Sequence, residues 1–339
     1  MRVLVTGGAG YIGSHTCIEL LTSGHDVFVV DNLSNGQFNV INQIKHITKK
    51  TVGFCKLDIR DTKHLTRILK DFNPDSVIHF AGLKSVSESI QKPLEYYDVN
   101  VTGSISLLKS MSKIGCKNIV FSSSATVYGK PKYLPYDEMH PTKPINPYGN
   151  TKLFVEKILY DWSLENDQRR SIVLRYFNPV GAHVSGQIGE SPNGTPNNLM
   201  PYLAQVAIGL RSNVNIFGND YNTVDGTGVR DYIHVCDLAN AHLGAIERLN
   251  SLNSFEVLNL GSGKGVSVLE LIKTFEKVNG VEISKKFTAR RKGDLPEFWA
   301  SSSLAEKRIG FRAKYNLEQM CRHAWVWQTK NSNGINSKN

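Results

Sequence analysis

The chain has 339 residues, of which 40% are hydrophobic and 21% charged, and its formal net charge is +10. This composition is that of an ordinary globular protein and excludes a disordered chain, and the length suffices for about two domains. The densest basic cluster is Arg290-Arg291-Lys292, and no helix-turn-helix, zinc-finger or RNP motif accompanies it, so we expect no nucleic-acid partner.

The cellular location can be inferred from simple sequence features. No apolar run approaches the roughly 20 residues that span a bilayer, so we expect no membrane contact. The first strand pattern starts at residue 2, which leaves no room for a signal peptide. The 5 cysteines are scattered and form no Cys-x-x-Cys pair, which is typical of a reducing compartment. We therefore expect a cytoplasmic protein.

The first half of the chain alternates short apolar runs with helical patterns. The apolar runs predict strands at Val3–Thr6, Val27–Val30, Val52–Leu57, Ser76–Phe80, Asn118–Ser122 and Ser171–Tyr176. Helical patterns lie near residues 12–23, 62–71, 90–115 and 148–166. Continuous apolar strands are typical of a parallel sheet that is buried on both faces. We therefore predict an α/β fold with a doubly wound, Rossmann-type parallel sheet.

The pattern changes after about residue 177, where loops rich in Gly, Pro and Asn appear. Here the sequence predicts strands at Val214–Phe217 and Val257–Leu260 and helices near 199–210, 236–249, 266–278 and 316–329. We predict a Rossmann domain over residues 1–177, into which later segments can cross back, and a smaller α+β domain over residues 178–330. The polar residues 331–339 are expected to form a frayed tail.

The N-terminal segment carries a glycine fingerprint. Gly7, Gly10 and Gly13 separate the first strand from the first helix, where the missing Cβ atoms let backbone approach a pyrophosphate at the helix N-terminus. The second strand ends at Asp31, 18 residues after Gly13, where a carboxylate can accept hydrogen bonds from both hydroxyls of an adenine ribose and repel a 2′-phosphate. No arginine follows Asp31 closely, so the sequence predicts NAD rather than NADP as the cofactor.

A Tyr-x-x-x-Lys pair opens a later helix. Tyr148 and Lys152 are four residues apart, so they share one face of the helix. A tyrosine that acts as a base near neutral pH needs its pKa of about 10 lowered by about three units, which the Lys152 ammonium and a positive nicotinamide ring can supply. Ser124 stands at the carboxyl end of a predicted strand, where this fold places its site, and it can hydrogen-bond a substrate hydroxyl and the tyrosine.

In this order and spacing, the glycine fingerprint, the serine-rich strand end and Tyr-x-x-x-Lys resemble the extended short-chain dehydrogenase/reductase superfamily. Within it, longer motifs are similar to the UDP-glucose 4-epimerase (UDP-galactose 4-epimerase) family, from residue 1 to about residue 330. These motifs are His79–Lys84, Lys92–Asp98, Phe121–Gly129, Arg175–Ala182, Pro196–Pro201, Asp225–Val235 and Gly293–Pro296.

The resemblance implies roles for individual residues. Tyr148 would be the catalytic base, Ser124 would hydrogen-bond the sugar hydroxyl, and Lys152 would lower the pKa of Tyr148. NAD would be held by Gly7, Gly10, Tyr11, Ile12, Gly13, Asp31, Asn32, Asp58, Ile59, Phe80, Ala81, Gly82, Lys84, Asn100, Ser122, Tyr148, Lys152 and Tyr176. The UDP-sugar would be held by Ser124, Tyr148, Phe177, Asn178, Asn198, Leu199, Phe217, Arg230, Tyr232, Arg291, Asp294 and Phe298. Arginines suit a diphosphate independently, because their forked donors match phosphate oxygens.

The implied activity is an isomerase reaction of galactose metabolism that interconverts UDP-galactose and UDP-glucose. The sugar C4 would be oxidised to a 4-keto intermediate, which turns over and is reduced on its opposite face. The resemblance also implies a homodimer formed through the helices near 90–115 and 148–166. No residue pattern indicates a bound metal.

Two alternative activities remain open. An epimerase of this family can also act on UDP-N-acetylglucosamine and UDP-N-acetylgalactosamine when the residue just after Gly-Asp-Leu-Pro is small. In this chain that residue is Phe298, which should exclude an N-acetyl group by its bulk. A nucleotide-sugar 4,6-dehydratase is disfavoured, because Ala125-Thr126 stand where dehydratases of this superfamily carry Asp-Glu.

Overall fold

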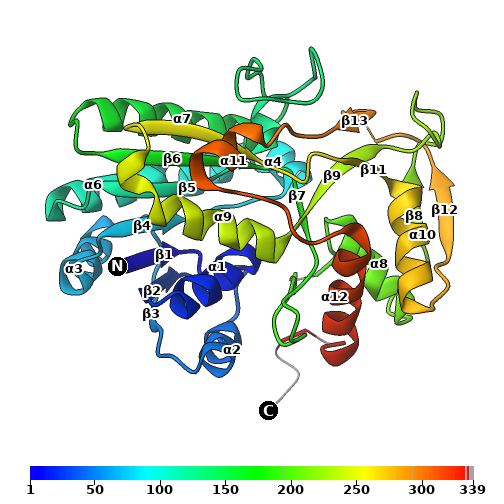
Figure 1. The fold of residues 1–339 in the computed structure, drawn as a ribbon, viewed down its shortest axis with the longest axis horizontal. Coiled ribbons are helices and arrows are strands. Elements are labelled where there is room, and N and C mark those ends of the chain that lie inside the picture. The colour runs from blue at the N-terminus through cyan, green and yellow to red at the C-terminus, as the bar shows by residue number, and fades with distance from the viewer. Residues whose placement is uncertain (193, 292, 333, 336–339) are drawn as a thin grey trace.

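A seven-stranded parallel sheet forms the centre of the protein (Figure 1). The computed structural model describes residues 1–192, 194–291, 293–332 and 334–335. The strands run in the order β10-β6-β5-β4-β1-β2-β3, and every neighbouring pair is parallel. This arrangement confirms the predicted doubly wound, Rossmann-type sheet. The strands are β1 (Arg2–Thr6), β2 (Asp26–Asp31), β3 (Gly53–Lys56), β4 (Ser76–His79), β5 (Asn118–Ser124), β6 (Arg170–Tyr176) and β10 (Phe255–Leu260).

Each face of this sheet packs on its own layer of helices. Along β1, Val3 and Val5 enter one hydrophobic core and Leu4 enters another, as the two-residue period of a strand requires. The first core is covered by α1 (Tyr11–Thr22), α2 (Asn39–Thr48), α9 (Val235–Glu247) and α11 (Ser303–Ile309). The second is covered by α3 (Thr62–Phe72), α6 (Gly103–Ile114) and α7 (Pro147–Leu164). Within the described residues, no helix is long and apolar enough to cross a membrane.

The helix predicted near 90–115 is broken into shorter pieces. α4 (Val86–Gln91) ends before Lys92, and Pro93 then starts α5 (Pro93–Tyr96), because proline has no N–H to extend a helix but fits the first turn of a new one. A π-helical segment, η1 (Tyr97–Thr102), follows and leads into α6. It carries the buried side chain of Asn100, consistent with the frequent occurrence of π-helical turns at functional sites.

A smaller lobe stands beside the main sheet, with β8, β12, α8, α10 and α12 on the right in Figure 1. Its hydrophobic core contains Leu271, Ile272 and Phe275. β13 has 2 residues and β11 has 3, too few to show a hydrophobic period, so the sequence predicted neither. The strands are β7 (Asn178–Val180), β8 (Val214–Phe217), β9 (Val229–His234), β11 (Gly265–Ser267), β12 (Lys285–Thr288) and β13 (Glu297–Phe298). The helices are α8 (Leu199–Ala207), α10 (Val268–Asn279) and α12 (Leu317–Lys330), with short turns η2 (Ala125–Val127) and η3 (Leu249–Ser251) elsewhere in the chain.

The chain crosses between the lobes more often than a single boundary at residue 177 implies. α9, β10 and α11 all follow that residue, yet they pack on the main sheet, where β10 pairs with β6. The predicted strand Val257–Leu260 therefore belongs to the first lobe, through the crossover that the prediction allowed.

The described part of the predicted tail, residues 331–339, is packed rather than frayed. Asn331 Nδ2 donates to Gly186 O at 3.0 Å. Ile335 is buried in the core that α1 and α9 cover. Residues 333 and 336–339 lie outside the described residues.

Candidate active site

The turn between β1 and α1 is so tight that only glycine fits. Gly7 has a φ of +72°, and a Cβ there would lie 2.6 Å from Ala81 N. A Cβ on Gly13 would lie 2.4 Å from Gly7 O. Gly10 at the N-cap has no side chain with which to cap α1, which leaves the first-turn N–H groups available to an anionic ligand. The turn therefore has the close backbone packing that the glycine fingerprint requires, and its role as a phosphate site stays a prediction.

A buried carboxylate at the end of β2 borders this turn. Asp31 Oδ2 accepts a hydrogen bond from Ala9 N at 3.0 Å, and Oδ1 accepts one from Leu33 N at 2.8 Å. Burial raises the pKa of Asp31, and these two hydrogen bonds oppose that shift. Each carboxylate oxygen has further lone-pair capacity, so Asp31 can fix the glycine turn and still accept from a ribose. Nearby, Asn32 Nδ2 donates to Asp58 Oδ2 at 3.1 Å.

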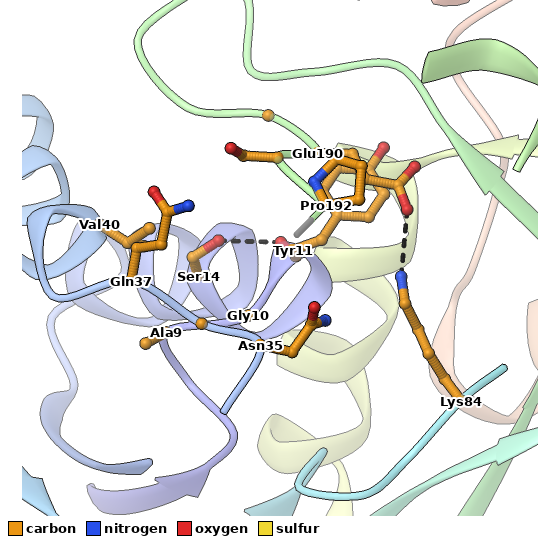
Figure 2. A pocket seen from close by; sticks show the side chains of 13 residues that line it. Ala9, Gly10, Tyr11, Ser14, Asn35, Gln37, Val40, Lys84, Glu190 and Pro192 are labelled. Carbon is orange, nitrogen blue, oxygen red and sulfur yellow. Dashed lines mark hydrogen bonds and ion pairs between the residues drawn. The ribbon is translucent and has the colours of Figure 1, made fainter. Parts of the chain in front are cut away.

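Figure 2 shows the pocket in front of the N-terminus of α1, with Gly10 and Tyr11 in its lining. Lys84 Nζ forms an ion pair with Glu190 Oε1 at 3.1 Å across this pocket (Figure 2). The same oxygen accepts a hydrogen bond from Asn198 Nδ2 at 2.8 Å. The sequence predicted Lys84 and Asn198 as residues for two different ligands but missed Glu190, which joins them from a loop without a recognisable pattern.

The carboxyl end of β5 meets the first turn of α7. Ser124 Oγ accepts hydrogen bonds from Thr126 N at 3.2 Å and from Thr126 Oγ1 at 3.0 Å, and its interaction with the Tyr148 hydroxyl acts to lower the pKa of Tyr148. Asn146 caps α7, since its Oδ1 accepts a hydrogen bond from Gly149 N at 2.8 Å. The cap fixes where the helix starts and thereby holds Tyr148 beside Ser124, as the sequence predicted.

Lys152 is buried and Tyr148 is half-buried. Lys152 Nζ donates to Ser122 O at 2.7 Å and lies 5.8 Å from the centroid of the Tyr148 ring. Burial raises the pKa of Tyr148 to about 12, although its hydrogen bond with Ser124 acts to lower it. Burial lowers the pKa of Lys152 to about 8, and the charge of Glu156 acts to raise it. Burial therefore outweighs the effect of Ser124 on the Tyr148 hydroxyl, and the lowering of this pKa by Lys152 together with a nicotinamide ring stays a prediction.

Other predicted cofactor residues act on the backbone or on each other. Asn100 Oδ1 accepts from Leu83 N at 2.7 Å and its Nδ2 donates to Leu83 O at 3.0 Å, so Asn100 fixes the loop that follows β4.

The Tyr176 hydroxyl is hydrogen-bonded to His242 Nε2, and the His242 ring lies 4.7 Å from that of Phe80. The sequence did not predict His242. Among the rest, Ile12 and Ile59 pack into the two cores, the backbone of Ala81 abuts Gly7, and Gly82 faces Asn100.

Two arginines of the smaller lobe meet at one carboxylate. Arg291 Nε donates to Asp294 Oδ2 at 2.9 Å, and Arg230 Nη2 lies 3.9 Å from Asp294 Oδ1. Arg230 Nη1 also donates to Leu295 O at 2.9 Å, and the Arg291 guanidinium lies 4.6 Å from the Phe217 ring centroid. The structure therefore gathers four residues that the sequence assigned to UDP.

The remaining predicted substrate residues stand at the ends of short elements. Asn178 on β7 pairs with Tyr232 on β9. Burial raises the pKa of Tyr232 to about 12, and the charges of the two arginines oppose this shift. Asn198 is the N-cap of α8 and Leu199 is its first residue.

Phe298 lies where the two lobes meet. On β13 it pairs with Arg230. Its half-buried ring lies 5.1 Å from Phe177 and 4.8 Å from Tyr136, and it packs on the cluster that contains Ala125, next to Ser124. Phe298 thus packs beside the end of β5, and its role as the residue that limits the size of the sugar stays a prediction. The sequence missed Tyr136, which packs against it.

A glycine turn after β1, an acidic residue closing β2, and Ser124, Tyr148 and Lys152 together define a protein of the short-chain dehydrogenase/reductase class. No group of three or more His, Cys, Asp or Glu in the described ranges could hold a metal. The family model described as GDP-mannose 4,6 dehydratase matches residues 4–324.

Individual relatives narrow this class. UDP-glucose 4-epimerase of Bacillus subtilis is 51% identical, and the alignment covers 99% of each chain. The crystal structure of UDP-glucose-4-epimerase from Stenotrophomonas maltophila with NAD and formylated UDP-arabinopyranose is 50% identical, with a TM-score of 0.95 over 97% of this chain and 98% of that one. The enzyme from Bifidobacterium longum in complex with NAD+ and UDP is 49% identical, with a TM-score of 0.95 over 98% and 100%. The chain belongs to the UDP-glucose 4-epimerase family, which confirms the resemblance.

Proposed function

We propose that this protein interconverts UDP-galactose and UDP-glucose with NAD as its resident cofactor. The observation that carries the proposal is that Ser124, Tyr148 and Lys152 meet at the carboxyl edge of the sheet that also holds the glycine turn. The membership in an epimerase family supports it, and so does the fit of the cradle at Gly7 and Gly13, where added Cβ atoms would collide with backbone.

The residues around the glycine turn would hold NAD. The first-turn N–H groups of α1 would bind its pyrophosphate, and Asp31 would accept from the adenine ribose. Asn100 and Tyr176 would shape the nicotinamide side. When bound, NAD would supply the hydride chemistry, as acceptor of the sugar C4 hydride and as its donor to the opposite face of the 4-keto sugar.

Tyr148 would act as the base that removes the proton of the sugar 4-hydroxyl, with Ser124 hydrogen-bonded to the same hydroxyl. Burial raises the pKa of Tyr148 to about 12, so the phenolate needs positive charge nearby. Lys152 supplies one such charge, and the oxidised cofactor brings another. The proton would return from Tyr148 when the sugar is reduced.

The smaller lobe would hold UDP through Arg230 and Arg291, whose donors suit diphosphate oxygens. Asp294 orients both arginines. UDP must be held firmly while the hexose stays free to turn over, and Phe298 would limit the room for that rotation. We therefore favour the sugars without a 2-acetamido group over UDP-N-acetylglucosamine and UDP-N-acetylgalactosamine. A dehydratase stays disfavoured, because Ala125 and Thr126 offer no carboxylate for elimination.

We further propose a homodimer formed through α6 and α7. A groove between these helices is lined by apolar Ile105, Leu108, Ile158 and Trp162 and by polar or charged Lys109, Ser112, Lys113 and Glu165, and Leu164 on α7 is exposed. An apolar centre with a polar rim is typical of a protein interface. The free state of all 5 cysteines supports a reducing, cytoplasmic location.

Product analysis tests the proposal. The purified protein is incubated with UDP-galactose, and the nucleotide sugars are separated and identified. UDP-glucose is the expected product, and a 4-keto-6-deoxy sugar would instead support the dehydratase. In parallel, the nucleotide released on denaturation is identified; NADP as the main species would contradict the assignment of Asp31.

A further inference from the structure

A buried ion pair joins α7 to β6 and lies next to Ser123, the residue before Ser124 on β5. Glu156 on α7 and Arg175 on β6 are 4% and 5% exposed. Arg175 Nε donates to Glu156 Oε1 at 3.0 Å and Nη2 donates to Oε2 at 2.6 Å, the bidentate geometry of a strong pair. Buried pairs of this kind add little net stability over apolar residues of the same size, so stability alone does not account for two charges at this place.

The position of Glu156 links it to both catalytic elements. Tyr148, Lys152 and Glu156 recur every four residues along α7, so they share one face of that helix. On the other side, Ser123 Oγ donates to Glu156 Oε1 at 2.5 Å, and Ser123 immediately precedes Ser124 on β5. The carboxylate therefore ties the helix of the base to the strand of the catalytic serine.

The surroundings of Lys152 give this carboxylate an electrostatic role. The lysine Nζ lies 4.9 Å from the Phe121 ring and donates to a backbone carbonyl of β5. Two other titratable side chains face Lys152, and both are uncharged. His79 on β4 is neutral, because burial and the Lys152 charge lower its pKa to about 3, and Tyr148 on α7 is a neutral phenol, because burial raises its pKa to about 12. The Glu156 carboxylate is the negative charge that favours the protonated lysine.

We propose that Glu156 is a positioning residue: clamped by Arg175 and Ser123, its carboxylate fixes α7 against β5 and keeps Lys152 protonated beside Tyr148. This role rests on the proposed function, which makes Tyr148 the base. Because Glu156 acts through the base and not through the UDP-binding arginines, its loss changes kcat and the pH dependence of kcat, while KM for UDP-galactose stays within about twofold.

The test uses a variant in which no buried charge is left unpaired. Glu156→Met combined with Arg175→Met replaces the pair by apolar side chains, a change that folded proteins tolerate. Without the neighbouring carboxylate, Lys152 loses its proton at a lower pH. The alkaline limb of the pH profile of kcat therefore shifts to lower pH by about one unit. The matched control is Glu256→Met with Arg308→Met, which removes another ion pair of the same lobe and leaves the limb in place.

Glu156→Asp separates the charge from the reach of the side chain. It keeps the charge, so the alkaline limb stays in place, but the shorter side chain loosens the clamp and lowers kcat about tenfold. This variant also carries the test if the double variant does not fold. A folded double variant with the limb of the unmodified protein, or an aspartate variant with unchanged kcat, overturns the proposal. Tyr148→Phe distinguishes failure of the proposed function from failure of the role of Glu156. If Tyr148→Phe retains turnover, the proposed function fails. If Tyr148→Phe loses turnover but the double variant keeps the alkaline limb of the unmodified protein, only the role of Glu156 fails.

Discussion

The two lobes hold their functional residues in different ways. Lys152 and Glu156 are buried, and two hydrogen bonds fix them between a strand of 7 residues and a helix of 18. Arg291, in contrast, has a side chain that is 55% exposed and is held mainly by Asp294. Proton transfer requires fixed geometry, whereas binding of a diphosphate tolerates adjustment. In the proposed reaction, the chemistry would therefore belong to the rigid lobe and the binding of the nucleotide to the adaptable one.

The largest effect is expected in the rigid lobe. Tyr148→Phe keeps the ring but removes the hydroxyl, so the protein should fold and keep its NAD. Turnover of UDP-galactose should fall by about 10²–10⁴, the range for loss of a general acid or base. Steady-state kinetics and the NAD content of the variant check this. Turnover near that of the unmodified protein would remove Tyr148 from the reaction.

In the adaptable lobe the effect should appear in KM. Arg230 is the more enclosed arginine and donates to Leu295 O, so Arg230→Ala should raise KM by about 10-fold to 100-fold, the value of a charge-assisted hydrogen bond. Arg291→Ala should raise KM less, because the Arg291 side chain is more exposed. A fall in kcat at unchanged KM for either variant would place that arginine with the chemistry and break the comparison.

The seam between the lobes should be sensitive to acid. His15 on α1 and His234, next to His323 of α12, are buried, which lowers their pKa values to about 3 and about 2. Below a pH of about 6.5 these histidines therefore bind protons in the unfolded chain but stay neutral in the folded protein. Above that pH they do not change the free energy of unfolding with pH, and below it each such histidine lowers that free energy by about 1.4 kcal/mol per pH unit. Urea unfolding at pH 7 and pH 5 measures the loss, and His15→Gln should reduce it by about 2 kcal/mol. An unchanged loss in that variant would contradict the role of His15.

The smallest effect is expected at the contact between the lobes. Phe298→Ser opens space beside Tyr136 and Phe177 and should raise kcat/KM for UDP-N-acetylgalactosamine about tenfold relative to UDP-galactose, the value of relieving overpacking. Both substrates are compared in the unmodified protein and in the variant, with Trp299→Ser as the neighbouring control. Equal efficiency on both substrates before any substitution would show that Phe298 is not the gate.

The sequence predicted the main sheet because its strands are continuous apolar runs, but it missed β9. That strand contains Asp231, a buried carboxylate that accepts hydrogen bonds from Ser262 N at 2.6 Å and Ala300 N at 3.1 Å. Its partners come from distant segments, so nothing local indicates that a charge can be buried there. α2 was missed because its N-cap is Phe38, which makes no side-chain cap.

The same reason explains which site residues were missed. Ser124, Tyr148 and Lys152 stand in motifs, so spacing and resemblance found them. Glu190 and His242 act through other side chains from loops or helices without a motif. The sequence also could not predict that the pKa of Tyr148 is raised, because this shift depends on how far the fold shields the hydroxyl from water.

The return of β10 to the main sheet has a consequence for synthesis. β10 pairs with β6 from Phe255↔Ser171 to Leu260↔Tyr176, so the open edge of β6 is covered only after residue 260 has left the ribosome. Until then, a growing chain that already contains β1 to β6 presents unpaired backbone groups that can associate with other strands. We expect a fragment ending at residue 177 to keep this edge open and therefore to aggregate more readily than the full chain.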